Sequence, residues 1–275
     1  MPRFSWGGLV TVVALALPLT LTQGLAASAA SPPRPYMPAV GAKASAPAPA
    51  RITARPDAGG GDGCNPNRTP DANLVPRFDG WQRTPGGTVG GVYSDIYNYS
   101  PWVHYYAPPF RPQPASYVAG WVAIDGTPSP AFGQIGWIEY PHGVRDIFTE
   151  TRNSNGDVVH LSPAEPINSQ SYYTVLINNT PGYLTYEVNG HGIDSEPALF
   201  TANEGEVSGE THSYADQMPG GYNQNEYFTD THIWYSGGWH NFSGSLISNP
   251  PIDPAYGHSI VSSTELLIWD WACPN

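Results

Sequence analysis

The residues that could do chemistry in this sequence gather in two stretches. In the first, GWVAIDGTPSPAFGQIGWIEY at 120–140, Gln134 is a polar residue in a run that otherwise has the character of a buried strand. A buried amide without a partner costs about 1–3 kcal/mol, so Gln134 needs either a neighbouring group or a ligand. Its N–H groups could stabilise an oxyanion by hydrogen bonding.

The second stretch, TANEGEVSGETHSYADQMPGG at 201–221, is acidic. Glu204, Glu206 and Glu210 lie close together there, and a solvated acidic loop would have this composition. If the segment is extended, however, Glu206 and Glu210 share a face because they are an even number of residues apart. A carboxyl near other carboxylates has a raised pKa and could act as an acid or base.

The elements that must position these residues are strands. Short runs rich in β-branched and aromatic residues recur between turn signals such as DGTPSP and NSNGD, whereas no long segment has helical periodicity. The runs cover 117–125, 132–140, 145–151, 171–178, 182–190, 227–235 and 263–271. This pattern predicts an all-β fold, an antiparallel two-sheet β-sandwich of the jelly-roll or concanavalin-like kind.

The run at 132–140 is apolar on both faces, which predicts a central strand covered on both sides. Gln134 and Gly136 share one face, and Trp137 lies on the other. Gly133 and Gly136 flank the amide and would leave room for another chain to approach. We therefore interpret this strand as part of a ligand cleft.

The chain is expected to have three parts. Residues 1–29 predict a secretory signal peptide, because the apolar run at 9–21 is short for a membrane span and is followed by the small residues ASA. Residues 30–63 are rich in Pro, Ala and Gly and predict a propeptide or linker. Residues 64–275 predict the β-sandwich domain. We expect a secreted, extracellular monomer without a membrane span.

The two cysteines, Cys64 and Cys273, lie at opposite ends of the predicted domain. In a secreted protein such an isolated pair predicts a disulfide. The eight histidines never fall at paired metal-ligand spacing, and phosphate-loop, nucleophile-elbow and HExxH motifs are absent from the sequence. We therefore expect neither a metal nor a cofactor.

The predicted domain is strongly acidic. It carries 6 basic and 21 acidic residues, a formal net charge of −15, and has no lysine. This charge excludes nucleic acid and anionic membranes as partners. Self-repulsion of the carboxylates is smallest when many are protonated, which hints at acidic working conditions, although a role in solubility explains the charge equally well.

The segment from about 117 to 235 resembles the glutamic peptidases called eqolisins. The resemblance rests on WVAIDG at 121–126, on Gln134 before Ile and Gly, and on the aromatic-then-acidic pattern of Phe148 and Glu150. It also rests on NEGEVSGET, where Glu210 is followed by Thr rather than by the Trp usual in that family. The resemblance implies a β-sandwich peptidase with a polypeptide substrate. It implies Gln134 and Glu210 as the catalytic pair, with Glu204 and Glu206 left open as alternatives to Glu210.

Aromatic and acidic residues around this pair would contact the substrate. The candidates are Trp121, Trp137, Phe148 and Glu150. Other β-sandwich proteins bind or degrade polysaccharides, and such an enzyme would need a second acid or base from Glu139, Glu150 or Glu187. A secreted relative without catalytic activity remains the third alternative.

Overall fold

The computed structural model describes residues 77–98, 101, 103, 117–127, 130–140, 143–167, 169–177, 182–211, 216–221, 224–249 and 256–270. The predicted signal peptide, the Pro/Ala/Gly-rich segment and both cysteines lie outside these residues. Within them the chain forms strands and turns but no α-helix. Accordingly, this part of the chain offers no helix suited to crossing a membrane.

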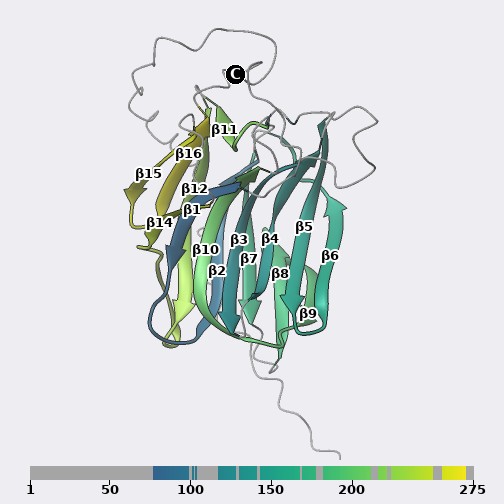
Figure 1. Ribbon diagram of the computed structural model, residues 1–275, viewed down its shortest axis with the longest axis vertical. Helices are drawn as coiled ribbons and strands as arrows, with labels where there is room; N and C mark the ends of the chain where they lie inside the picture. Colours follow the sequence, from purple (N-terminus) through teal and green to yellow (C-terminus); the bar gives the residue numbers. More distant parts are fainter. Residues whose placement is uncertain are drawn as a thin grey trace, which may run out of the picture.

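Two sheets pack face to face, and Figure 1 shows the seven-stranded sheet as the nearer layer. Its order is β14 (Ser245–Asn249), β1 (Arg77–Arg83), β10 (Thr201–Thr211), β3 (Val118–Thr127), β4 (Ala131–Tyr140), β5 (Val144–Asn153) and β6 (Gly156–Pro163). All its pairings are antiparallel. The predicted central position of 132–140 is confirmed, since β4 lies between β3 and β5.

The nine-stranded sheet forms the second layer. Its order is β15 (Tyr256–Ser262), β16 (Glu265–Asp270), β11 (Gly220–Gly221), β12 (Gln224–Tyr235), β2 (Val89–Tyr97), β7 (Gln170–Ile177), β8 (Tyr183–Val188) and β9 (His191–Pro197), with β13 (Gly238–Asn241) paired to β12. One parallel pairing, between β11 and β16, interrupts an otherwise antiparallel sheet. The predicted antiparallel β-sandwich is therefore confirmed.

The main core fills the space between the sheets. Its largest fully buried side chains are aromatic: Trp81, Trp137, Tyr173, Tyr186, Phe228 and Phe242. Alternate residues of each strand point into this core, as the alternating burial along β8 shows. Much of the high aromatic content of the sequence is therefore used to hold the two layers together.

A second, smaller apolar cluster covers the outer face of the seven-stranded sheet, the face turned away from the nine-stranded sheet. It consists of Ala119, Trp121, Ala123, Ile138 and Phe148, with Phe78, Tyr117 and Tyr140 packed against it. This cluster explains why 132–140 is apolar on both sides. Gln134 lies on this outer face as well, because it is an even number of residues from Ile138 of the cluster.

The two glycines beside Gln134 are required by the packing of the protein itself. A Cβ at Gly133 would lie 2.6 Å from Leu184 Cδ1, so this glycine lets β4 approach β8. A Cβ at Gly136 would lie 2.0 Å from the carbonyl oxygen of Gly120 on the neighbouring strand. The interpretation that these glycines leave room for a ligand is therefore wrong, because protein atoms occupy that space.

Gly136→Ala is expected to lower the free energy of unfolding by about 3 kcal/mol or more, because backbone atoms would have to move to admit the methyl group. Denaturant unfolding measures this change. Gly87→Ala is the matched control: nothing lies within 4 Å of its Cβ position, so it should change stability by at most about 0.5 kcal/mol. Equal stability of the two variants would contradict this account of β4.

Candidate functional site

The pairing register aligns Gln134 with two acidic residues on the outer face. Glu206 of β10 is opposite Ala123 of β3, Ala123 is opposite Gln134 of β4, and Gln134 is opposite Glu150 of β5. Residues directly opposite each other point to the same side of a sheet. Adjacent strands lie about 4.8 Å apart, so the Cα atoms of Glu206 and Gln134 are about 10 Å apart, with only a methyl group between them in the row.

Residues 201–211 of the acidic stretch, which include Glu204, Glu206 and Glu210, form the long strand β10, so the loop alternative is wrong for these residues. Val207 and its flanking glycines face the core, and a Cβ at Gly205 would lie 2.6 Å from Val92. Small inward residues thus let β10 pack closely on the second sheet. The opposite face of the strand presents Glu206, Ser208 and Glu210, as the even spacing predicts.

Gln134 has a partner within the protein. Its side-chain N–H donates a hydrogen bond of 2.8 Å to Glu150 Oε2, and Arg152 lies 3.7 Å from the other carboxylate oxygen. Burial raises the pKa of Glu150, although Arg152 and the bond from Gln134 act in the opposite direction. Because a primary amide carries two N–H groups, this bond orients Gln134 and leaves the second donor for a ligand.

Glu206 lies among other carboxyl groups. Its nearest acidic neighbours are Asp125 and Glu204, and one oxygen of each of the three lies within 4.8 Å of the others. Ser208 donates a 2.8 Å hydrogen bond to Glu206. Burial and then the charge of Asp125 raise the pKa of Glu206 well above its ordinary value. Burial and Glu204 raise the pKa of Asp125 to about 7. The group can therefore retain protons in weak acid.

Glu210 shares the outer face with Gln134 but not its row. It is opposite Ala119, four residues along the strand from the row of Gln134, which corresponds to about 13 Å. Both carboxyl oxygens accept hydrogen bonds, from Tyr117 Oη at 2.7 Å and from Trp121 Nε1 at 3.0 Å. Burial raises its pKa to about 7 against the effect of these bonds.

The predicted substrate-contacting residues are divided between the two faces. Trp121 and Phe148 lie on the outer face, in the row next to Gln134, and Glu150 lies in its row. Trp137 instead lies fully buried between the sheets, where its indole donates to Glu226 at 3.1 Å. Trp137 is therefore not brought together with Gln134.

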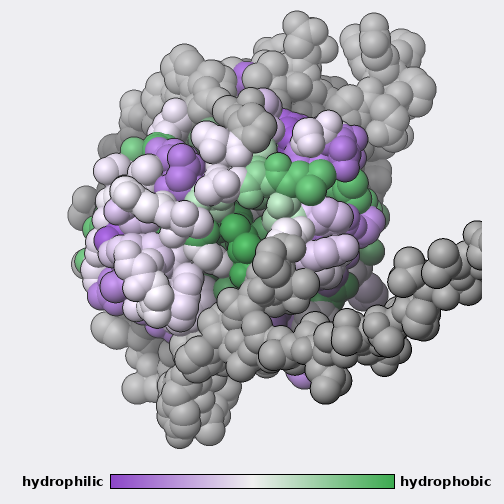
Figure 2. Space-filling view, turned by 90° about the horizontal axis from the view of Figure 1, so that it is seen from below, coloured by the Kyte–Doolittle hydropathy of each residue, from purple (hydrophilic) through white to green (hydrophobic). Residues whose placement is uncertain are grey.

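Sequence reasoning missed two features of this face. Asp125, within WVAIDG, belongs to the carboxyl group around Glu206, and its even distance from Ala123 could have indicated this. Beyond Glu150 and Phe148, the edge strand β6 places Val159 and Leu161, both more than half exposed. Figure 2 views the lower end of the sandwich rather than this face, and hydrophobic side chains reach the surface there too, between more hydrophilic areas. The rows of side chains that cross the outer face therefore begin with acidic residues on β10 and end with apolar residues on β6.

Comparison with known proteins finds similarity in three dimensions only. No family model matches the sequence, and no curated protein matches it. Scytalido-glutamic peptidase, solved with a peptide-based transition-state analogue, matches with a TM-score of 0.53 and 13% identity over 74% of this chain and 100% of that one. SCP-B, described as an eqolisin family member in complex with the tripeptide Ala-Ile-His, has a TM-score of 0.51 at 13% identity with the same coverage.

A β-glucanase of Bacillus licheniformis also matches, with a TM-score of 0.32 and 10% identity over 48% of this chain and 57% of that one. The TM-scores of 0.53 and 0.51 show that the two glutamic peptidases share the fold of this chain. At such low identity the similarity shows the fold and not the activity, which has to be argued from the row of Glu206, Gln134 and Glu150.

Proposed function

We propose that the chain is a secreted, monomeric peptidase that hydrolyses polypeptides in acid, with Gln134 and Glu206 as its catalytic pair. The observation that supports this most is the register that brings the amide and the carboxyl into one row on the outer sheet face. This proposal replaces Glu210 by Glu206 as the partner of Gln134, because Glu210 lies about 13 Å along the strand and has both oxygens occupied.

The reaction follows from what each side chain can do. Glu206 acts in its ionised form: the carboxylate removes a proton from the water that attacks the scissile carbonyl and then delivers it to the leaving nitrogen. Because the pKa of Glu206 is raised, only part of the population is ionised in weak acid, and the rate should fall as the pH drops further. The free N–H of Gln134 donates to the oxyanion, which is typically worth about 2.7–4 kcal/mol for one donor. Glu150 is a positioning residue, since it holds the amide through the 2.8 Å hydrogen bond.

The polysaccharide alternative has less support. Of the acids that could have supplied its second catalytic group, only Glu150 lies on the outer face. Glu139 faces inward and is 3.2 Å from Arg145, and Glu187 lies on a strand of the other sheet. Glu150 shares the row of Glu206, but their Cα atoms are three strand spacings apart, about 14 Å, whereas the paired carboxyl groups of glycosidases lie about 5–9.5 Å apart.

A cleavage assay tests the proposal. The purified protein should cleave a denatured protein substrate in acid and should resist pepstatin-type inhibitors, because the proposed pair, Gln134 and Glu206, is not a pair of aspartates. Failure to cleave between about pH 2 and 8, together with retention on a polysaccharide column, would favour the carbohydrate alternative.

Asp125→Asn is expected to move the acidic limb of the activity profile to lower pH. The charge of Asp125 raises the pKa of Glu206, so its removal lowers that pKa, and the base then becomes ionised in stronger acid. The measurement is kcat/KM against pH. Asp157→Asn, at an exposed residue paired with Arg152, is the control and should leave the limb in place. If the acidic limb does not move in Asp125→Asn, the charge of Asp125 does not act on the catalytic carboxyl, and this prediction is wrong.

A further inference from the structure

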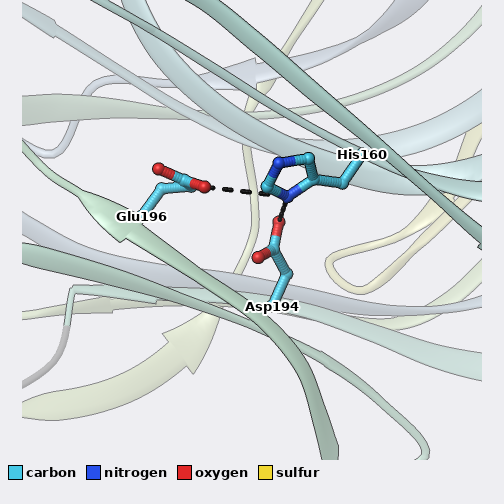
Figure 3. A group of neighbouring side chains, drawn as sticks. All are labelled: His160, Asp194 and Glu196. Atoms are coloured by element: carbon cyan, nitrogen blue, oxygen red, sulfur yellow. Dashed lines mark hydrogen bonds and ion pairs between the residues drawn. The ribbon is translucent and has the colours of Figure 1, made fainter.

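The open edge of the sandwich carries a polar cluster where the inner faces of the two sheets should be apolar. His160 lies on β6, the edge strand of one sheet, and is opposite Thr149. Asp194 and Glu196 lie on β9, the edge strand of the other sheet, opposite the core residues Tyr186 and Leu184. Figure 3 shows both carboxyl groups directed at the same nitrogen of the imidazole.

The three side chains converge on a small volume. His160 Nδ1 is 2.9 Å from Asp194 Oδ2 and 3.6 Å from Glu196 Oε1, and the potential ligand atoms all lie within 4.8 Å of one another. A tetrahedral ion with ligands at about 2.0–2.1 Å holds neighbouring ligand atoms about 3.3 Å apart. The separations of 2.9 and 3.6 Å bracket this value, so a small cation requires only minor side-chain movement.

The carboxyl of Asp194 is also held in place by groups that are not potential ligands. The Thr149 hydroxyl donates to Asp194 Oδ2, and the backbone N–H of Ser195 donates to Oδ1 at 2.8 Å. Such outer contacts orient the ligands of metal sites. The Asp194 carboxyl is thus oriented by a side chain of β5 on one sheet and by the backbone of β9 on the other.

Charge and atom type indicate the class of ligand. A protonated His160 would balance only one of the two carboxylates, both of which are less than one-fifth exposed. A divalent cation balances both. The imidazole nitrogen favours a cation of the zinc class over Ca²⁺ or Mg²⁺, which prefer oxygen.

We propose that His160, Asp194 and Glu196 bind a zinc-class divalent cation that links β6 to β9. The half-exposed imidazole leaves a further coordination position open to water, so the site would be a clamp between the layers rather than a closed cage. His160 lies 34 positions from Asp194, which is why the histidine spacing in the sequence gives no sign of the site. This proposal is independent of the peptidase activity.

The test uses the whole protein without an affinity tag, stripped with a chelator and then titrated with Zn²⁺ at neutral pH. We expect one Zn²⁺ per chain and, at about 100 times the dissociation constant, a rise in melting temperature of about 5 °C or more. Ca²⁺ should give no such rise. A protein that shows neither stoichiometric Zn²⁺ binding nor a thermal shift would overturn the proposal.

His160→Gln should weaken Zn²⁺ binding at least about tenfold. Asp194→Asn should do the same while keeping an oxygen for the Thr149 hydrogen bond. His191→Gln is the matched control, because His191, at the start of β9, is an exposed histidine like His160 but does not belong to the cluster. Undiminished binding in His160→Gln and Asp194→Asn would place the ion elsewhere and overturn the assignment.

Discussion

Glu206→Gln is expected to abolish peptide hydrolysis, whereas Glu210→Gln should keep most of it. Loss of a positioned acid–base group typically costs about 10²–10⁴-fold in rate. Glu206 lies in the row of Gln134 with only Ala123 between them, and Glu210 does not. Turnover of a denatured protein or a peptide substrate in acid measures the difference.

Gln134→Ala should lower kcat by about 10²–10³-fold, the usual effect of removing one oxyanion donor. The double variant of Gln134 and Glu206 should have a kcat only slightly lower than that of either single variant, because the effects of mutating residues that act on one transition state are not additive. Unfolding curves serve as the control for each variant. If Glu210→Gln removes activity in a folded protein while Glu206→Gln does not, the acid–base role belongs to Glu210.

The protein is expected to be considerably more stable in acid than at neutral pH, with Glu226 as a principal cause. Its carboxyl is fully buried between the sheets, and this burial raises its pKa well above the ordinary value, against the effects of Trp137 and Arg145. For a raised carboxyl pKa, the stabilisation is complete below the unfolded pKa and disappears as the pH rises through the folded pKa.

Two other groups act in the same direction. The pKa of Glu210 rises from 4.5 to about 7, which corresponds to about 3 kcal/mol lost as the pH rises through this interval. His258 of β15 pairs with the buried Asp79 of β1, and this pair raises the pKa of His258. A raised histidine pKa stabilises the folded state below the unfolded value of 6.5, and the contribution is lost above it.

Denaturant unfolding at a series of pH values from about 4 to 8 tests this expectation. The free energy of unfolding should fall with rising pH, and Glu226→Gln should make the fall shallower because the variant has no carboxyl to ionise. Asp157→Asn, which removes an exposed carboxyl whose pKa is lowered by Arg152, should leave the fall in place. Stability that is constant or increases with pH would contradict the role of Glu226.

The sequence predicted the fold class because β-branched and aromatic runs alternate with clear turn signals. It also indicated that the strand of Gln134 is central, since a strand that is apolar on both sides has to be covered on both sides. Parity already placed Trp137 on the opposite face, because it is three positions, an odd number, from Gln134, so its inclusion among the substrate contacts conflicted with the strand pattern. These properties are local and can be read from one segment.

The choice between Glu206 and Glu210 could not be made locally. It depends on how β10 pairs with β3, about 80 residues earlier in the chain, and a register shift of four residues would bring Glu210 instead of Glu206 into the row of Gln134. The strand β10 itself was uncertain because glycine and glutamate are both unfavourable in strands. The functions of Gly133 and Gly136 likewise depend on which atoms of other strands lie opposite them.

The strand order also has a consequence for how the chain folds. The pairs β3–β4, β4–β5, β5–β6, β7–β8 and β8–β9 are hairpins between consecutive strands and can form early. In contrast, β1 pairs with β10 and β14, and β2 pairs with β12, across more than a hundred residues. Such high contact order predicts slow folding, with β10 and β12 among the last strands to dock. Until then the edges of their partner strands are exposed, and the newly made chain is most prone to aggregate.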